Sequence, residues 1–492
     1  MARVVVIGAG FGGLSAAAYL AQAGHAVTVL ERAGQPGGRA RVVRQAGFTF
    51  ELGPSWYLMP DVFAEWFAQF GHRPADFYNL VALEPSYQVV GHDQTFSVPR
   101  PPAVFEVFER LEPGAGAALR QLLAKAEREY AEVRGGLLEL DGLDWRQALR
   151  RDVLGYVLRP ELARSYHGRI KRYFRSPALQ QAMEFMTVFM GGSPHNIPAF
   201  YSLLAHVDMN LGGWYPMGGF GAVARAVAAV AQEQGARLEY GADVTAILVR
   251  GGRVAGVRAG GQAIPADLVV SGADYRFTET QLLPEAARSL PEAYWRRRQL
   301  SPTGLLVTLG VKGRVPNLLH HNLFFDTDWD RHFREVFQEN VWSRDPLFYL
   351  CVPSKTDPGV APAGHENLFV LAPMAAGTHP GQSELEAGAD RLTARIERAA
   401  GQPFAASIVT RSVYGPEYFE REFHAAGGNA FGLSHTLTQS ALLRAPLRSR
   451  RLPNLYYTGQ STNPGTGVPM VLLSGKIVSG IIMKDSRAKP GT

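Results

Sequence analysis

The chemistry that is clearest in this sequence lies in a glycine-rich turn near the N-terminus. The turn has the spacing G-x-G-x-x-G and contains Gly8, Gly10, Phe11, Gly12 and Gly13. In this spacing the first glycine permits a tight turn, the second lets the backbone approach a pyrophosphate, and the third lets a helix pack closely on a strand. The amides of a helix that begins here would face the phosphates. The turn therefore predicts a dinucleotide-binding site.

The segments on both sides of the turn agree with this prediction. Residues 4–7 are a β-branched run typical of a buried parallel strand, residues 14–23 are rich in small residues as expected of a helix, and residues 26–30 are a second apolar strand. Glu31 ends that strand, about 20 residues after the turn, where an acid can bind a ribose hydroxyl. An acid at this place argues against NADP, which carries a 2′-phosphate. A Rossmann-like unit without a ligand is the alternative interpretation.

A second glycine-rich segment helps to distinguish FAD from NAD as the bound dinucleotide. Residues 36–40 read Pro-Gly-Gly-Arg-Ala and follow closely on Arg32. Glycines permit close approach, and an arginine can bind phosphate with two parallel hydrogen bonds. The segment resembles the flavoprotein superfamily of amine oxidases and carotenoid desaturases, which implies FAD as the cofactor. The resemblance places Gly37, Gly38 and Arg39 at the flavin side of the dinucleotide; an ordinary glycine-containing loop is the alternative.

The composition limits the class of protein. A chain of 492 residues suggests two or three domains, and 46% hydrophobic against 19% charged residues allows a large core and excludes disorder. The single cysteine, Cys351, excludes an intramolecular disulfide and a multi-cysteine zinc or iron–sulfur site, and no metal is expected. The net charge of +6 comes without a nucleic-acid motif, so a nucleic-acid partner is not expected.

The sequence also predicts the location of the protein in the cell. The first strand starts at once, which leaves no room for a cleavable signal, and no apolar run of about 18 residues suggests a membrane-spanning helix. Residues 103–190 are expected to be mainly helical, and arginines crowd residues 146–175 with apolar residues between them. This pattern is typical of a helix on a membrane surface. We therefore expect a cytoplasmic protein at the inner face of the membrane; a solvated helical face is the alternative.

Later segments complete the pattern. A helix is expected over residues 222–235, followed by strands around 244–249, 254–257 and 266–270. In the flavoprotein superfamily this order supplies a strand beside the adenine and a small-residue turn near the dinucleotide. The resemblance implies those positions for Val244 and Ala273.

The C-terminal segment contains another strand, glycine-rich turn and helix. The strand at residues 455–457 leads into a turn, and a helix begins near residue 468. Free amides at a helix N-terminus suit a flavin carbonyl or a flavin that gains negative charge. The cofactor-binding residues expected here are Gly459, Gln460, Gly467, Val468, Pro469 and Met470.

This segment narrows the resemblance to a family. Residues 463–470, taken with the N-terminal pattern, resemble bacterial-type phytoene desaturases over nearly the whole chain. The sequence departs from that family at Gln460, where a small residue is common, and at Asn463, where histidine is common. The resemblance implies an α/β fold: a Rossmann-like FAD-binding domain of the amine oxidase/glutathione reductase-2 type, a mixed-sheet substrate domain and a helical insertion. The expected ranges are 1–85, 215–290 and 420–492; 86–110 and 291–419; and 111–214.

The activity that the resemblance implies is FAD-dependent desaturation of phytoene or a similar carotene. Hydride would pass to the flavin and a proton to a base or water. Arg164 and Asp208 are the candidates for the proton step, and each also has a structural interpretation. No second dinucleotide pattern is evident, so oxygen or a membrane quinone is the expected electron acceptor. A carotenoid isomerase or ketolase, an amine oxidase, and a non-catalytic isoprenoid-lipid escort protein are the alternatives.

Overall fold

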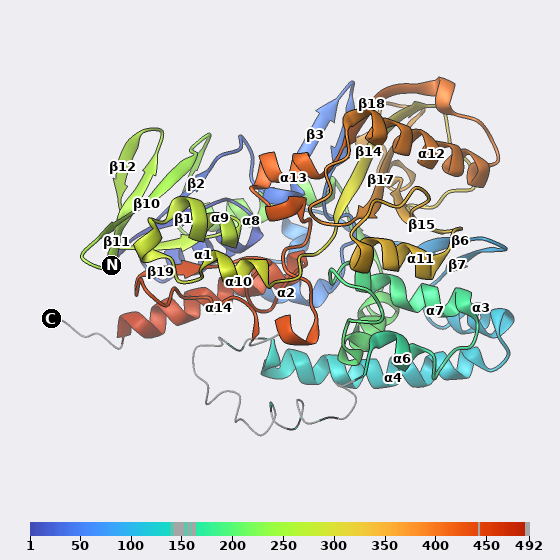
Figure 1. The fold of residues 1–492 in the computed structure, drawn as a ribbon, viewed down its shortest axis with the longest axis horizontal. Helices are drawn as coiled ribbons and strands as arrows, with labels where there is room; N and C mark the ends of the chain where they lie inside the picture. Colours follow the sequence, from blue (N-terminus) through green and yellow to red (C-terminus); the bar gives the residue numbers. More distant parts are fainter. Residues whose placement is uncertain are drawn as a thin grey trace.

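Two sheets organise the chain (Figure 1). The computed structural model describes residues 1–138, 164–440 and 443–487, together with positions 140, 153, 155 and 159. Part of the arginine-rich stretch, including the arginines at 146, 150 and 151, lies outside the described residues.

The first sheet is parallel and has the order β19-β13-β1-β2-β9. Its strands are β1 (Arg3–Ile7), β2 (Ala26–Glu31), β9 (Arg237–Tyr240), β13 (Leu268–Ser271) and β19 (Leu455–Tyr457). Successive side chains of a strand point to opposite faces. Val4 and Val6 therefore enter one hydrophobic cluster while Val5 and Ile7 enter another. Burial on both faces explains why these strands are continuous apolar runs.

Different elements cover the two faces of the parallel sheet. Three helices pack on one face: α1 (Phe11–Gln22), α8 (Gly219–Glu233) and α14 (Val468–Arg487). An antiparallel sheet covers the other face: β10 (Val244–Arg250), β11 (Arg253–Ala259) and β12 (Gln262–Pro265). The short helices α9 (Tyr275–Phe277) and α10 (Glu292–Arg296) lie beside it.

The second sheet is mixed and has the order β18-β14-β17-β16-β15-β6-β7. Its strands are β6 (Tyr87–Gly91), β7 (Thr95–Val98), β14 (Thr303–Lys312), β15 (His321–Phe325), β16 (Phe348–Cys351), β17 (His365–Met374) and β18 (Ile408–Tyr414). Only the β6–β15 pair is parallel among these described strands. Helix α12 (Gln382–Ala400) packs on one face through residues such as Leu385 and Ile396.

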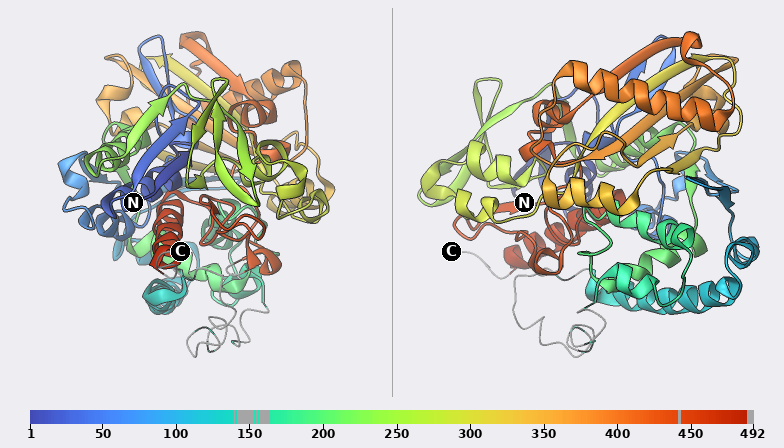
Figure 2. Two further views of the ribbon diagram at one scale, coloured as in Figure 1. Left: turned by 90° about the vertical axis from the view of Figure 1, so that its left-hand side faces the viewer. Right: turned by 45° about the vertical axis from the view of Figure 1, so that its right-hand side comes forward.

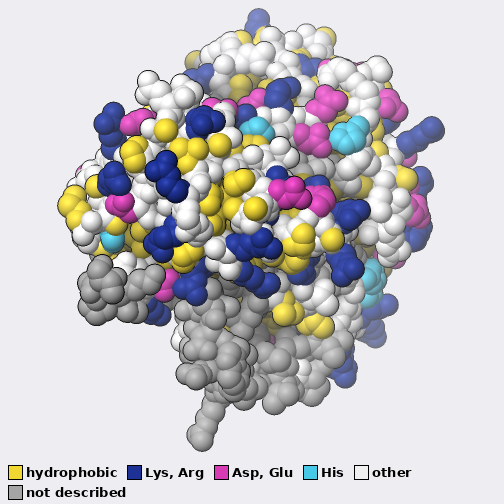
Figure 3. All heavy atoms as spheres, turned by 60° about the vertical axis from the view of Figure 1, so that its left-hand side comes forward, with side chains coloured by type: hydrophobic (Ala, Val, Ile, Leu, Met, Phe, Trp, Pro, Cys, Tyr) yellow, Lys and Arg dark blue, Asp and Glu magenta, His cyan; other side chains and the backbone are white. Residues whose placement is uncertain are grey.

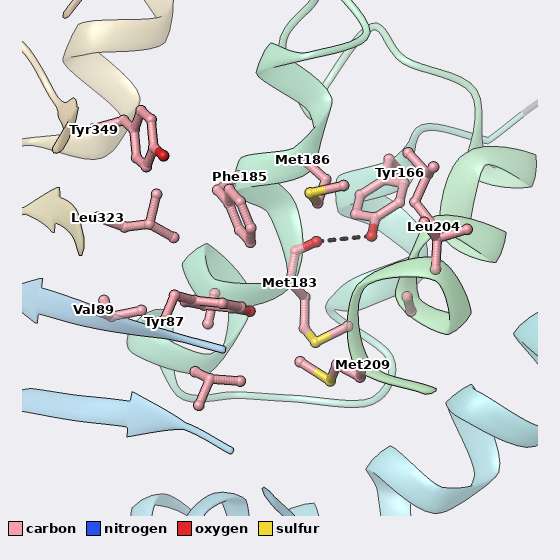
Figure 4. Close-up of a cluster of buried hydrophobic side chains, with 14 of the residues drawn as sticks. Tyr87, Val89, Tyr166, Met183, Phe185, Met186, Leu204, Met209, Leu323 and Tyr349 are labelled. Atoms are coloured by element: carbon pink, nitrogen blue, oxygen red, sulfur yellow. Dashed lines mark hydrogen bonds between the residues drawn. The ribbon is translucent and has the colours of Figure 1, made fainter. Parts of the chain in front are cut away.

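A helical region covers the other face of the mixed sheet (Figures 1 and 2). It contains α3 (Ala103–Leu111), α4 (Ala115–Glu132), α6 (Tyr166–Ile170) and α7 (Pro177–Glu184). In Figure 4, Tyr87 and Leu323 from the sheet point toward Phe185 at the end of the helical segment. Arg169 is buried here and pairs with Glu129 at 2.7 Å, so this arginine belongs to the core and not to a basic surface.

The remaining elements are short. They are β3 (Val42–Gln45), β4 (Phe48–Glu51), α2 (Pro60–Ala68), β5 (Leu80–Ala82), β8 (Trp214–Pro216), α11 (Trp329–Arg334) and α13 (Pro416–Phe423). None of the helices within the described ranges is both long and apolar enough to cross a bilayer.

Candidate functional site

A cavity of about 830 Å³ lies where the strands of the parallel sheet end. Parallel strands bring their carboxyl ends to one edge, and ligands of such sheets bind in the crevice outside that edge. The turns that follow β1, β13 and β19 and the last residue of β2 all line this cavity. The sequence-predicted residues in its lining are Gly8, Gly10, Phe11, Gly12, Glu31, Arg32, Gly37, Gly38, Arg39, Val244, Ala273, Gly459, Gln460, Gly467, Val468, Pro469 and Met470.

The glycine-rich turn presents the N-terminus of α1 to the cavity. Gly10 is the N-cap, and an added Cβ at Gly10 would meet no described atom within 4 Å. The space beside Gly10 is therefore left for a ligand. Gly13 is not in the cavity lining, because its Cα faces the preceding strand: a Cβ there would lie 2.1 Å from the Gly8 carbonyl oxygen. Gly13 thus permits the helix to pack, as its place in the pattern predicts.

Glu31 is fixed by two backbone amides. Its Oε2 accepts a hydrogen bond from the Ala9 amide at 2.7 Å, and its Oε1 accepts one from the Ala33 amide at 2.8 Å. A carboxylate has about four acceptor positions, so two bonds leave capacity for a hydroxyl. The side chain is only partly buried and lines the cavity. The arrangement suits the ribose role that the sequence predicts.

Arg39 and Gln460 meet at the cavity from opposite ends of the chain. With its carbonyl oxygen toward Gly432, the Gln460 amide accepts hydrogen bonds from Arg39 Nη2 at 3.2 Å and from the Gly432 amide at 2.9 Å. Desolvation lowers the pKa of the Arg39 guanidinium, and the nearby Asp274 opposes this effect. Arg39 Nε has no hydrogen-bond partner among the described residues. A guanidinium with an unused donor suits an anionic or carbonyl oxygen in the cavity.

The N-terminus of α14 also lines the polar, glycine-rich part of the cavity. Val468 opens the helix, and Pro469 stands at its start, where a missing N–H costs no helical hydrogen bond. The first turn of a helix leaves amides without intrahelical partners and carries partial positive charge. Two helix N-termini, those of α1 and α14, therefore face one cavity.

The rest of the cavity is apolar. Its walls come from the loop at residues 52–59, the end of α4 and the segment at 186–207. The aliphatic and aromatic side chains that line it include Leu52, Leu58, Met59, Val133, Leu137, Met186, Phe189, Met190, Phe200, Leu203, Leu204, Val207, Leu371, Ala430 and Phe431. A polar, glycine-rich part thus continues into an apolar part.

Comparisons with known proteins identify the family. The family model described as flavin containing amine oxidoreductase matches residues 11–483. The chain belongs to this family. A carotenoid 3,4-desaturase of Haloarcula japonica is 41% identical over 98% of both chains. A zeta-carotene-forming phytoene desaturase of Myxococcus xanthus is 36% identical over 99% of this chain and 95% of its own. These relatives confirm the resemblance to carotenoid desaturases.

Comparison with solved structures confirms the fold. An oxidoreductase from Methanosarcina mazei matches with a TM-score of 0.66, at 18% identity and over 98% of this chain and 100% of that chain. Cyclohexylamine oxidase from Brevibacterium oxydans matches with a TM-score of 0.62, at 14% identity and over 99% of both. The α/β fold of the FAD-binding amine oxidase type, predicted from the sequence, is therefore confirmed.

The chain is an FAD oxidoreductase, and its cavity fits the cofactor. The space beside Gly10, the acid at the end of β2 and the unpaired donor of Arg39 lie along one cavity. These are the features that a pyrophosphate, a ribose and an electron-rich ring require.

Arg32, predicted as a cofactor residue, holds a neighbouring helix. Its Nη2 donates to the carbonyl oxygens of Arg421 and Glu422 at 3.0 and 2.5 Å, near the end of α13. The ring of His424 stacks on Phe277 with centroids 3.9 Å apart. In this flavoprotein, Arg32 closes the cavity by joining β2 to α13.

Neither candidate for the proton step lines the cavity. Arg164 is exposed, and its carbonyl oxygen accepts a hydrogen bond from the Ala199 amide at 2.9 Å. Asp208 is 3% exposed, and its Oδ2 accepts a hydrogen bond from Tyr87 at 2.9 Å. Burial raises the pKa of Asp208 to about 7. Both residues thus lie apart from the flavoprotein's cofactor-binding part.

Sequence reasoning missed a polar group within the cavity lining. Tyr201 contacts His435 Nδ1 at 2.6 Å, and the Thr466 amide donates to His435 Nε2 at 3.3 Å. Since Nε2 accepts, Nδ1 carries the proton and donates to Tyr201. Desolvation and Arg444 hold the pKa of His435 well below its usual value, so the ring is neutral. No local motif predicts this group, because Tyr201, His435 and Thr466 come from three distant segments.

Proposed function

We propose that this flavoprotein is a carotenoid desaturase. The observation that carries the proposal is the continuity between the polar, glycine-rich part of the cavity and its apolar part. A polyene has no polar group to bind, so a cavity for it needs aliphatic and aromatic walls. The names of the relatives, a carotenoid 3,4-desaturase and a phytoene desaturase, support the same substrate class.

Desaturation removes a hydride and a proton from adjacent carbons, and a C–C single bond becomes a double bond. FAD, when bound, supplies the two-electron acceptor for the hydride. The residues of this chain hold the hydrocarbon and exclude water: Met186, Phe189 and Phe200 provide apolar walls. Glu31, held by its two backbone amides, and the donors of Arg39 would hold the cofactor beside these walls.

The proton needs a separate acceptor. His435 already uses both ring nitrogens, and Asp208 lies outside the cavity lining. Water at the mouth of the cavity is therefore the acceptor we favour, in agreement with the absence of an acid or base motif in the sequence. Oxygen or a membrane quinone is the electron acceptor that we propose for reoxidation.

The preferred substrate within the carotenes has two candidates. Phytoene is the first, because the family pattern at residues 463–470 resembles phytoene desaturases. A carotene that is already conjugated, such as lycopene, is the second, because the carotenoid 3,4-desaturase is 41% identical to this chain. The 33% identity with a 4,4′-diapolycopene oxygenase of Methylomonas keeps oxygenation as a possible outcome of the test.

We also propose that the protein takes its substrate from a membrane surface. Leu437 and Leu443 line the cavity and are 52% and 57% exposed. Large exposed apolar side chains at the mouth of an apolar cavity suit contact with lipid. On the face drawn in Figure 3, basic side chains are interspersed with hydrophobic ones, which suits an anionic surface.

The decisive experiment is an anaerobic mixture of the FAD-loaded protein with carotene in liposomes. Phytoene and lycopene are supplied in separate reactions, flavin absorbance is followed, and products are separated by chromatography. Flavin bleaching with a more conjugated product supports desaturation and identifies the substrate. A shifted isomer profile without bleaching would indicate an isomerase, and an oxygenated product that forms only in air would indicate a ketolase. A protein that retains carotene but no flavin would be a lipid escort.

A further inference from the structure

Two histidines and the single cysteine come together behind the cavity wall. His321 opens β15, Cys351 closes β16, and the two residues lie directly opposite each other in the antiparallel ladder. His320 precedes the strand. One possible ligand atom from each of the three side chains lies within 4.8 Å of the others. All three residues are buried, with exposures of 5%, 0% and 2% for His320, His321 and Cys351.

One nitrogen of each imidazole ring is already occupied. His320 Nδ1 contacts Thr356 Oγ1 at 2.7 Å, and His321 Nδ1 contacts the Tyr349 hydroxyl at 2.7 Å. The two Nε2 atoms are buried and have no hydrogen-bond partner anywhere in the described chain. A buried polar atom without a partner costs about 1–3 kcal/mol, so two such atoms in one cluster of residues require an explanation.

The chemistry of the three side chains suits a cation. An imidazole with its hydrogen on Nδ1 has a lone pair on Nε2, and a thiol binds a metal as thiolate when the cation displaces its proton.

We propose that His320, His321 and Cys351 form a buried binding site for a soft d10 cation, either Cu⁺ or Zn²⁺. Thiolate and imidazole are the ligands that these cations prefer. Bond lengths near 2.0 Å to nitrogen and 2.3 Å to sulfur place ligand atoms roughly 3.5 Å apart, so side-chain shifts of about 1 Å close the site. The bonds of Thr356 and Tyr349 to the Nδ1 atoms hold both rings with Nε2 available, as the outer hydrogen bonds of metal sites do.

The net charge of the metal complex distinguishes the two cations. Two neutral imidazoles, one thiolate and Cu⁺ sum to zero, which a buried site tolerates. With Zn²⁺ one positive charge remains. The carboxyl group of Glu51, which acts electrostatically on Cys351, would compensate that charge when ionised. The neutral complex makes Cu⁺ the favoured cation.

The site contacts the wall of the cavity. The Trp56 ring stacks on His321 with centroids 4.1 Å apart, and the Tyr349 hydroxyl contacts Ser55 Oγ at 2.8 Å. Ser55, Trp56 and Tyr349 all line the cavity. A cation on Nε2 fixes the proton of His321 on Nδ1, which then donates to Tyr349. The cation thus orders this wall.

The test uses the FAD-loaded full chain. The protein is incubated anaerobically with Cu⁺ or with Zn²⁺, passed through a gel-filtration column and measured for bound metal and by X-ray absorption. We expect one equivalent of bound metal with one sulfur and two nitrogen neighbours. The chain has one cysteine and ten methionines, and both sulfur types can bind Cu⁺, so a sulfur neighbour that disappears in Cys351→Ser identifies the thiolate. Loss of both metals on the column, or neighbours that are nitrogen and oxygen only, would overturn the proposal.

Two variants test whether Cys351 is a metal ligand. Cys351→Ser should lower the affinity for Cu⁺ at least about 100-fold in competition with a Cu⁺ chelator, since losing a ligand costs more than losing an outer hydrogen bond. His332→Gln is the matched control, because His332 is also a buried histidine with an unpartnered Nδ1 among the described residues but belongs to α11. Its affinity should stay within about twofold. Equal affinities for the wild type and Cys351→Ser would contradict the assignment.

Discussion

The carboxylate of Glu31 accepts a hydrogen bond from the backbone amide of Ala9 at 2.7 Å. The acid at the end of β2 is therefore tied to the glycine-rich turn after β1, so the two segments predicted to bind ribose and pyrophosphate are built as one unit. Both strands end at the same edge of the parallel sheet, which brings the two segments together.

Replacing this acid should weaken FAD binding. In Glu31→Gln one carboxylate oxygen becomes an NH₂ group, which faces the amide of Ala9 or Ala33 as donor against donor. Hydrogen bonds to charged groups contribute about 1.5–3 kcal/mol, so we expect an FAD dissociation constant about 10- to 100-fold higher. Fluorescence titration of the apoprotein measures it. Glu239→Gln, on the adjacent strand β9 and outside the cavity lining, should leave the constant unchanged.

The two ends of the glycine pattern should respond differently to an added methyl group. Gly10→Ala places a Cβ where no described atom lies within 4 Å, and its φ of −72° suits any residue. The apoprotein should therefore keep its melting temperature and bind FAD at least about tenfold more weakly, because the methyl occupies the pyrophosphate side.

Gly13→Ala should instead destabilise the apoprotein. Its Cβ would lie 2.1 Å from the Gly8 carbonyl oxygen, which no side-chain rotation relieves. We expect a loss of stability of the apoprotein of about 1–3 kcal/mol, the usual cost of overpacking. Calorimetry of both apoproteins distinguishes the variants. Equal melting temperatures would show that Gly13 is not a packing glycine.

Local patterns made the cofactor-binding part predictable. The helix predicted at 14–23 spans Phe11–Gln22, and the helix predicted near residue 468 begins at Val468. Each fingerprint combines a strand, a turn and a helix within about 30 residues, so adjacent residues in the sequence remain adjacent in space. Gln460, which departs from the family pattern, also lines the cavity, and its role in cofactor binding stays a prediction.

The remaining parts depend on contacts between distant segments. Tyr201 meets His435 across 234 residues, and His321 meets Cys351 across two strands. No periodicity in the sequence reports such a pairing, because it follows from sheet order and not from local propensity. Arg169 is a further example. Its charge suggested a position on the surface, but it lies in the core, where it pairs with Glu129 from α4.

Membrane contact should depend on the apolar mouth of the cavity. The double variant Leu437→Gln/Leu443→Gln removes two large exposed apolar side chains from that mouth. Burying one leucine side chain in lipid is worth about 1.5–3 kcal/mol, so liposome binding should weaken at least about tenfold. Co-sedimentation with liposomes measures it. Val341→Gln/Val409→Gln changes side chains that are 43% and 50% exposed but lie outside the lining, and should bind as the wild type does.

Asp208 should make stability depend on pH. Burial raises its pKa to about 7 in the folded protein, above the unfolded value near 3.9, so folding favours the protonated acid. The unfolded chain loses this proton first, and stability therefore falls as pH rises from about 4 to about 7. Between pH 5 and pH 8 the cost grows by about 2–3 kcal/mol.

Asp208→Asn should remove this dependence, because an amide oxygen can still accept the hydrogen bond of Tyr87 and has no charge to lose. We expect urea unfolding of the variant to gain about 2–3 kcal/mol on the wild type between pH 5 and pH 8. Glu51 and Glu184, whose pKa values burial raises to about 7 and about 8, act in the same direction in both proteins and cancel in the difference. Glu106→Gln, at an exposed position of α3, should show no such gain. A difference between Asp208→Asn and the wild type that stays constant with pH would mean that Asp208 is ionised in the folded protein, which would make it available as a base after all.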